Sequence, residues 1–421
     1  MKSVLRNPTF RRLFAGRLVT NAGDSLYYVA AMWLVLELGG SSFYTGLAGA
    51  LVLAPQALQF LAGPLVDRWQ IGRTLVASQI VQALLVLVVP LAWLTGHLTV
   101  GLVLVVMPVL SLANQFVYPA ETAALPRIVD DDELVDANSA FSFAYQGVDL
   151  AFNAAGGVLV AVVGAVAIYA IDSVTFAAAA GLFALAGVPE ADRAERDEDA
   201  AALADYLAKL REGVDYVRGT ILVPVMAGSV VVNFTIGAAM AVLPAFAEAR
   251  GGAETYGLLL AAVTGGILVG ALVASPMKRY SLFALSTVGF GIGGSLWLAA
   301  LASPWTLGTA ALFFFAWIPV GVTNVVFAAF KQSVVPDDLL GRVSSVGMSV
   351  STAAAPFGSL LGGAAGDLWS PTAVVAAAGV GFLFVTAFWL AHPLLRGVPS
   401  VEEIDPAKYG LATERSENAA T

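Results

Sequence analysis

Cysteine is absent from this 421-residue chain, and histidine occurs only twice, as His97 and His392. The absence of cysteine excludes disulfides, thiolate nucleophiles, and metal or iron–sulfur sites held through sulfur. His97 falls in a short polar turn and His392 at the end of an apolar run, so neither is placed for metal binding or acid–base catalysis. We therefore expect no metal, no cofactor and no enzymatic activity.

Charge is scarce as well. Charged residues make up 12% of the chain, against roughly 25% in an average soluble domain, whereas hydrophobic residues make up 58% and the mean hydropathy is +0.82. The net charge of −9 gives no basic footprint for a nucleic acid. Acidic residues gather in hydrophilic segments such as "PEADRAERDEDAA" (189–201), which are either ordinary loops or the acidic surface of a salt-adapted protein. The composition is that of an integral membrane protein.

Apolar runs bounded by charge, glycine and proline cover nearly the whole chain. Each is long enough for the roughly 20 residues that cross a bilayer. They form two groups of six, separated by a hydrophilic segment, which predicts an all-α membrane protein with twelve transmembrane helices. The predicted spans are 12–38, 43–66, 74–94, 99–121, 134–162, 166–187, 221–247, 255–276, 282–302, 305–330, 339–364 and 372–394.

The hydrophilic segment between the two groups divides the chain into predicted domains. These are an N-terminal six-helix bundle (1–189), a cytoplasmic linker (190–219), a C-terminal six-helix bundle (220–396) and a disordered cytoplasmic tail (397–421). Four apolar residues of the linker recur at helical spacing: Leu203, Leu207, Leu210 and Val214. They predict an amphipathic helix lying on the inner membrane face.

Lysine and arginine gather in alternate loops: before the first span, after the second and fourth, in the linker, and at equivalent positions of the second half. Among the predicted outer loops, Arg250 is the single basic residue. Cytoplasmic loops of membrane proteins retain positive charge. We therefore expect a multi-pass protein of the plasma membrane with both termini in the cytoplasm.

The two halves also repeat. Shifting the sequence by 206 residues places "IVDDDEL" (128–134) on "VVPDDLL" (334–340), and Gly156-Gly157 on Gly362-Gly363. Two six-helix halves in the same orientation are the parallel repeat of one large class of secondary transporters.

The polar segment between the second and third spans, "GPLVDRWQIGRT" (63–74), resembles a signature of the major facilitator superfamily, Gly-x-Leu-x-Asp-Arg followed by Gly-Arg. The stretches "SLYYVAAMWLVLEL" (25–38) and "YPAETAALPRIVDDDELVDANSAFSF" (118–143) resemble the branch that holds enterobactin exporters and macrolide-efflux proteins. The resemblance covers nearly the whole chain. It implies the major facilitator fold, with two pseudo-symmetric six-helix bundles.

The resemblance also implies that this polar segment closes a cytoplasmic gate when the cavity faces outward. Gly63 lets two helices approach closely, and the carboxylate of Asp67 is favoured beside the N–H groups of a helix N-terminus. The arginines supply partners or positive charge for topology. The equivalent loop of the second half has no matching aspartate, so no symmetrical second latch is expected. The gate residues are Gly63, Leu65, Asp67, Arg68, Gly72 and Arg73.

Few ionisable residues fall within the predicted spans. Asp24 lies about 18 Å from the inner end of the first span at 1.5 Å per residue, and Asp149 lies about equally deep in the fifth. Inserting such a group costs on the order of 3 kcal/mol or more, so both are candidates for coupling to a proton or another ion. The alternative role is hydrogen bonding between helices.

The resemblance implies that the first and fifth helices are neighbours, so the two carboxylates could share a proton or cation. Asp149 stands where the branch usually carries an arginine. This departure indicates a cationic substrate or a changed partner for Arg17 or Asp24. Asp172 lies nearer the outer end of its span and is expected to be structural.

In the fold that the chain resembles, the first, fourth, seventh and tenth helices line the cavity. Polar residues on these spans are candidate ligand contacts, and hydrogen bonds between helices are the alternative role for each. The candidates are Asn21, Tyr28, Asn114, Asn233 and Asn324.

These features predict a secondary active transporter that works by alternating access as a monomer, with a small-molecule substrate and protons or another coupling ion. The expected activity is proton-coupled efflux of an amphiphilic molecule, drug-like or siderophore-like, and the alternative is ion-coupled uptake of a small nutrient. Two features depart from proton-driven exporters: Phe152-Asn153 replaces a Gly-Pro pair, and the fourth span has no embedded arginine. A lipid-modifying enzyme would need a nucleophile or metal site, and a passive channel does not need duplicated halves.

Overall fold

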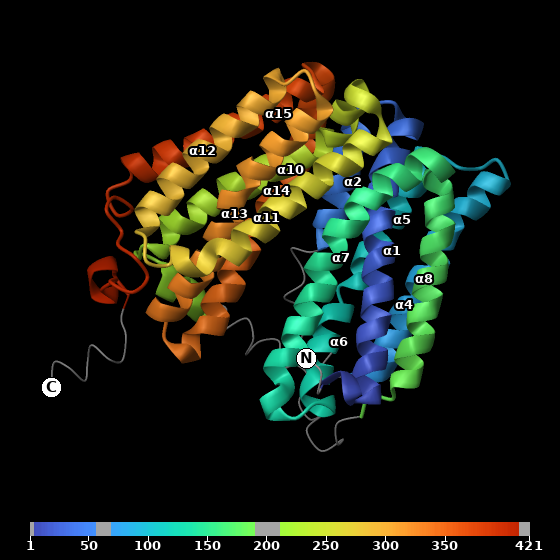
Figure 1. Ribbon diagram of the computed structural model, residues 1–421, viewed down its shortest axis with the longest axis horizontal. Helices are drawn as coiled ribbons and strands as arrows, with labels where there is room; N and C mark the ends of the chain where they lie inside the picture. Colours follow the sequence, from blue (N-terminus) through green and yellow to red (C-terminus); the bar gives the residue numbers. More distant parts are fainter. Residues whose placement is uncertain (1–3, 56–68, 190–210, 412–421) are drawn as a thin grey trace. The chain divides into compact units, whose positions relative to one another are not determined.

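The computed structural model describes residues 4–55, 69–189 and 211–411, and it consists of helices and the turns between them (Figure 1). The helices of the first half are α1 (Pro8–Gly39), α2 (Ser42–Leu53), α4 (Ile71–Leu94), α5 (Val100–Asn114), α6 (Val117–Ile128), α7 (Leu134–Val163) and α8 (Ala165–Ala186). Those of the second half are α10 (Leu222–Gly251), α11 (Ala253–Met277), α12 (Leu282–Ala302), α13 (Thr306–Val334), α14 (Asp337–Leu368) and α15 (Pro371–Ala391). Short 3₁₀ turns are Val4–Arg6, Asp131–Glu133 and Pro406–Tyr409.

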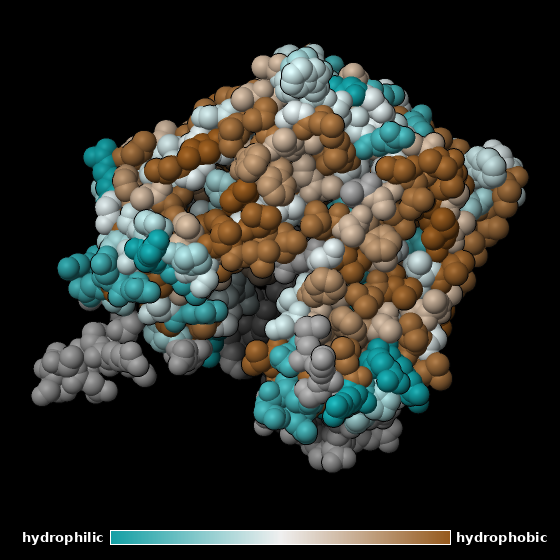
Figure 2. All heavy atoms as spheres, in the orientation of Figure 1, coloured by the Kyte–Doolittle hydropathy of each residue, from teal (hydrophilic) through white to brown (hydrophobic). Residues whose placement is uncertain are grey.

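The described helices overlap each of the twelve predicted spans, although residues 56–66 of the second span lie outside the described residues. The fourth span is longer than predicted: it runs over Val100–Ile128 as α5 and α6, interrupted at Gln115 and Phe116. In the described ranges, eight spans are long and apolar enough to cross a membrane by length and composition alone. Figure 2 shows apolar side chains along the helices and hydrophilic ones gathered near helix ends. This pattern is typical of helices whose outer faces contact lipid.

The chain forms two compact units, Met1–Glu198 with Leu243–Ala261, and Asp199–Val242 with Ala262–Thr421. The end of α10 and the start of α11 are an exception to a single division in the linker, because they belong to the first unit. Close packing explains the exception. A Cβ atom on Gly157 of α7 would lie 2.7 Å from Cα of Gly257 in α11, and Trp33 of α1 stacks on Tyr256 with ring centroids 6.4 Å apart.

The sequence repeat has a structural counterpart inside each unit. Gly156 of α7 faces α1, where its Cβ would lie 3.1 Å from Val29 Cγ2. Gly362 of α14, its partner in the repeat, faces α10, where its Cβ would lie 2.7 Å from the Cβ of Ala238. In both halves a glycine of the fifth span lets the backbone of the first span approach closely.

The segment after α15 is ordered where we expected a disordered tail from 397. The backbone N–H of Leu282 donates to Pro399 O at 3.1 Å, and that of Ile221 donates to Tyr409 O at 3.1 Å. These donors lie at the N-terminal ends of α12 and α10, where helices leave N–H groups without partners. Val398 and Leu411 are buried beside them. The prediction was wrong for 397–411 because these carbonyls and apolar side chains bind the ends of two helices, and 412–421 lie outside the described residues.

The predicted amphipathic linker helix is described only from 211, where residues 211–217 are helical, so Leu203, Leu207 and Leu210 lie outside the described residues. Val214 is half-buried, and Glu212 forms an ion pair with Arg342 of α14. This part of the linker therefore packs on the second unit.

Candidate functional site

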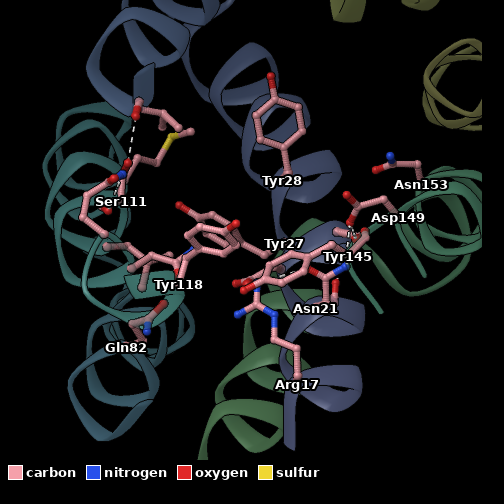
Figure 3. A pocket seen from close by; sticks show the side chains of 17 residues that line it. Arg17, Asn21, Tyr27, Tyr28, Gln82, Ser111, Tyr118, Tyr145, Asp149 and Asn153 are labelled. Carbon is pink, nitrogen blue, oxygen red and sulfur yellow. Dashed lines mark hydrogen bonds between the residues drawn. The ribbon is translucent and has the colours of Figure 1, made fainter. Parts of the chain in front are cut away.

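A polar cavity of about 530 Å³ lies in the first unit (Figure 3). Its walls come from α1, α2, α4, α5, α6 and α7, and they combine carboxylates, amides and tyrosine rings. The lining residues are Arg17, Asn21, Asp24, Ser25, Tyr27, Tyr28, Val52, Gln82, Met107, Leu110, Ser111, Asn114, Gln115, Tyr118, Tyr145, Asp149 and Asn153.

One stripe of α1 supplies the centre of this wall. Arg17, Asn21, Asp24 and Tyr28 recur at intervals of four, three and four residues, which places them on one face of a helix. Leucine, valine, alanine and methionine cover the rest of α1, and they are buried against neighbouring helices, chiefly α8 and α7. A helix that is apolar on its other faces lies inside a bundle, and this position brings the polar stripe to the cavity.

Asp149 of α7 is held against α1 by hydrogen bonds. Ser25 Oγ donates to Asp149 Oδ1 at 2.6 Å, and Asn21 Nδ2 donates to the same oxygen at 2.9 Å. Asn21 also donates to the carbonyl of Ala144 at 2.9 Å. The expected proximity of the first and fifth helices is therefore present, and Asn21 joins them while it lines the cavity.

Asp24 differs from Asp149 in its partners. No hydrogen bond to its carboxylate is formed within the described ranges, although the charges of Arg17 and Asp149 act on it. Asp24 lies on the wall of the cavity.

A buried ion pair lies beside the cavity, and the sequence did not reveal it. Arg17 and Glu121 are only 4% and 1% exposed, and Nε of Arg17 lies 3.8 Å from Oε2 of Glu121. The hydroxyl of Tyr145 donates to the same oxygen at 2.6 Å, and Cζ of Arg17 lies 3.9 Å from the centre of the Tyr145 ring. The sequence indicates Arg17 as a possible partner of Asp149 and does not pair it with Glu121. The sequence offered one signal for this pair: Arg17 and Glu121 are a basic and an acidic residue that each fall inside a predicted span.

The other predicted residues are distributed over both units. Tyr28 and Asn114 line the cavity of the first unit. Asn233 and Asn324 line a separate cavity of about 60 Å³ in the second unit, where Asn233 Nδ2 donates to Ser229 O of its own helix at 2.9 Å.

The gate motif is described only in part. Gly63, Leu65, Asp67 and Arg68 lie outside the described residues. Gly72 and the exposed Arg73 begin α4. In the part of the chain that the structure covers, no group of three histidine or acidic side chains is placed to hold a metal ion.

Long apolar helices around a cavity with buried carboxylates define a membrane transporter. The chain belongs to the transmembrane secretion effector family of the major facilitator superfamily, whose profile matches residues 2–409. Members of this superfamily are transporters, so the expectation that the chain is not an enzyme is confirmed.

Two relatives match most of the chain. YvqJ of Bacillus subtilis (strain 168), described as an uncharacterized MFS-type transporter, is 24% identical over 384 residues, covering 88% of this chain and 89% of YvqJ. The multidrug efflux pump Tap of Mycolicibacterium fortuitum is 27% identical over 388 residues, covering 87% of this chain and 91% of Tap. The enterobactin exporter EntS of Escherichia coli O1:K1 / APEC is 29% identical over 137 residues, or 32% of each chain. The predicted branch is therefore confirmed.

Solved structures show the same fold at low sequence identity. The nucleoside transporter NupG has a TM-score of 0.71 at 11% identity, over 91% of this chain and 99% of NupG. A bacterial homolog of the human lysosomal transporter Spinster, in an inward-facing and occupied conformation, has a TM-score of 0.68 at 14% identity, over 91% of this chain and 96% of that one. The all-α major facilitator fold is confirmed.

Proposed function

We propose that this protein is a secondary active transporter that exports an amphiphilic small molecule by alternating access in exchange for protons, with Asp24 as the coupling carboxylate. The observation that carries the proposal is the contrast among the acidic groups of the cavity. Glu121 is paired with Arg17, and Asp149 accepts two hydrogen bonds, whereas Asp24 has no hydrogen-bond partner among the described residues. Asp24 is thus the carboxylate that can exchange a proton without breaking a structural contact.

The cavity surface supports an amphiphilic substrate. Tyr28 and Tyr118 offer aromatic faces, Met107 offers a deformable apolar surface, and Asn114 offers an amide. The family and the relatives that are exporters support outward transport rather than uptake.

The transport cycle follows from competition at Asp24. A proton bound there removes a negative charge from the cavity, and its release restores that charge for interaction with a substrate. A ligand or proton shifts the balance between inward-facing and outward-facing states only by the difference in its affinity for them. We propose further that the gate motif closes the cytoplasmic side, that both termini lie in the cytoplasm of a plasma-membrane protein, and that the monomer is the working unit.

Everted vesicles test this function. Respiration acidifies their lumen, a pH-gradient dye reports it, and amphiphilic cations, macrolides or siderophore-like acids are then added. With the wild-type protein, we expect at least one compound to reverse the quenching of the dye fluorescence. Asp24→Asn should abolish this recovery of fluorescence, because asparagine cannot exchange a proton.

Asp130→Asn is the matched control, since Asp130 is an exposed aspartate outside the cavity. It should respond as the wild type does. An equal response from Asp24→Asn would exclude Asp24 as the coupling group. Right-side-out vesicles test the opposite direction. If an inward ion gradient drives accumulation of a compound in them, the proposal of export is wrong and ion-coupled uptake takes its place.

A further inference from the structure

A second polar cluster lies between α1 and α8, behind the cavity wall. Asp24 and Tyr27 are three residues apart on α1, and Tyr169 and Asp172 are three residues apart on α8, so each pair shares a helix face. The two helices pack together along their length. The rings of Tyr27 and Tyr169 meet edge to face, with centroids 5.2 Å apart.

Asp172 is a fully buried member of this cluster. Its side chain is 0% exposed, and Oδ1 accepts a hydrogen bond from Thr175 Oγ1 at 2.9 Å. Its Oδ1 atom lies directly against the backbone of α1, because a Cβ atom on Gly23 would clash with it. Gly23 immediately precedes Asp24, so the two carboxyl groups lie near the same turn of α1.

Three polar atoms of the cluster have no hydrogen-bond partner within the described structure: Asp172 Oδ2, Tyr27 OH and Tyr169 OH. Buried polar atoms are nearly always hydrogen-bonded, so such a group requires an explanation. Tyr27 also lines the cavity, so it connects the cavity with the polar cluster between α1 and α8.

Among the described residues, no cation forms an ion pair with Asp172. The charge that acts on it is that of Asp24, whereas Arg17 acts on Asp24 and Asp149. Of the other helices packed on α8, α4 carries a single ionisable residue, Arg73, in its first turn, and α7 brings Asp149 to the cavity. An isolated carboxylate in this position would be a buried, unpaired charge, which is costly at membrane depth. A bound proton removes that charge and supplies a hydroxyl donor.

We propose that Asp172 is a second proton-carrying carboxyl of the transporter and forms a two-carboxyl proton site with Asp24 across the contact of α1 and α8. This inference rests on the proposed function, in which Asp24 exchanges the coupling proton. When Asp24 loses its proton, its negative charge acts on Asp172 and favours retention of the second proton. Asp172 thus retains a second proton at a position that the substrate does not contact.

Infrared spectroscopy of the purified protein tests the proposal without any substrate. A protonated carboxyl gives a C=O stretching band distinct from the carboxylate bands, and its loss is followed as the pH is raised. We expect a band at neutral pH that Asp172→Asn removes and the exposed control Asp130→Asn leaves unchanged. In Asp24→Asn the band should disappear at lower pH than in the wild type, because the neighbouring negative charge is gone.

An unchanged spectrum in folded Asp172→Asn would overturn the proposal. If that variant does not fold, Asp24→Asn decides, because Asp172 is intact there: a band that disappears at the same pH as in the wild type, or at a higher pH, would overturn the proposal. A band that appears only when sodium is removed would identify a metal-cation site and also overturn it. Because no substrate is used, these outcomes are independent of the vesicle experiment, and each proposal can fail alone.

Discussion

Replacing Glu121 with alanine is expected to destabilise the protein by about 3–5 kcal/mol, the usual loss when one partner of a buried ion pair is removed. The guanidinium of Arg17 would remain almost fully buried without its counter-charge, and the hydroxyl of Tyr145 would lose its acceptor. Transport should be lost as well, since Arg17 lines the cavity and its charge acts on Asp24 and Asp149. Thermal unfolding in detergent, followed by size-exclusion chromatography, measures the stability.

A double replacement separates loss of charge balance from loss of packing. Arg17→Met with Glu121→Leu removes both charges and fills the volume, so much of the stability should return, as it does when apolar residues replace other buried ion pairs. Transport should not return with it, because the positive charge at the cavity is gone. A single Glu121→Ala protein that is as stable as the wild type would show that the pair contributes nothing.

Replacing Gly157 with valine is expected to disrupt the contact of α7 with the start of α11 and to abolish transport. The new Cβ would clash with Ala253 O, and it would lie 2.7 Å from Gly257 Cα and 2.8 Å from Gly257 N. All three are backbone atoms, so no side-chain rotation relieves the overlap. Overpacking of this kind costs about 1–3 kcal/mol or more. Thermal unfolding and the vesicle assay measure the two effects.

Gly181→Val is the matched control, because a Cβ atom on Gly181 of α8 meets no atom within 4 Å. It should retain stability and transport. Gly257→Val should reproduce the Gly157→Val defect, since its Cβ would lie 2.6 Å from Gly157 Cα. Wild-type stability in both glycine variants would contradict the close backbone packing.

Prediction from the sequence succeeded where the signal is carried by long segments. The all-α membrane fold follows from the cost of placing a helix of apolar residues in water and a charged one in lipid. The repeat of 206 residues places Gly156 on Gly362, and both lie against the first helix of their own half. The polar stripe of α1 was also predicted in part, since Asn21, Asp24 and Tyr28 are candidate residues of the first span and recur at helical spacing.

Prediction failed where contacts join segments far apart in the chain. Arg17 and Glu121 are 104 positions apart, and no local pattern pairs an arginine near the start of one span with a glutamate at the end of another. The tail over 397–411 reads as hydrophilic, yet its carbonyls accept hydrogen bonds from the first N–H groups of α10 and α12. Spacing within a helix carries no information about either contact.

The sequence alone determined that this is a duplicated all-α membrane transporter with few ionisable groups inside its helices, because hydropathy, charge bias and repeat are properties of segments and need no partner. Only the tertiary structure decided the surroundings of each group: Glu121 pairs with Arg17, Asp149 is hydrogen-bonded to α1, and Asp172 is buried against α1. Asp24 lines the cavity and has no hydrogen bond to any described residue. The reason is physical. The state of a buried charge depends on its nearest neighbours in space, and those neighbours come from other helices.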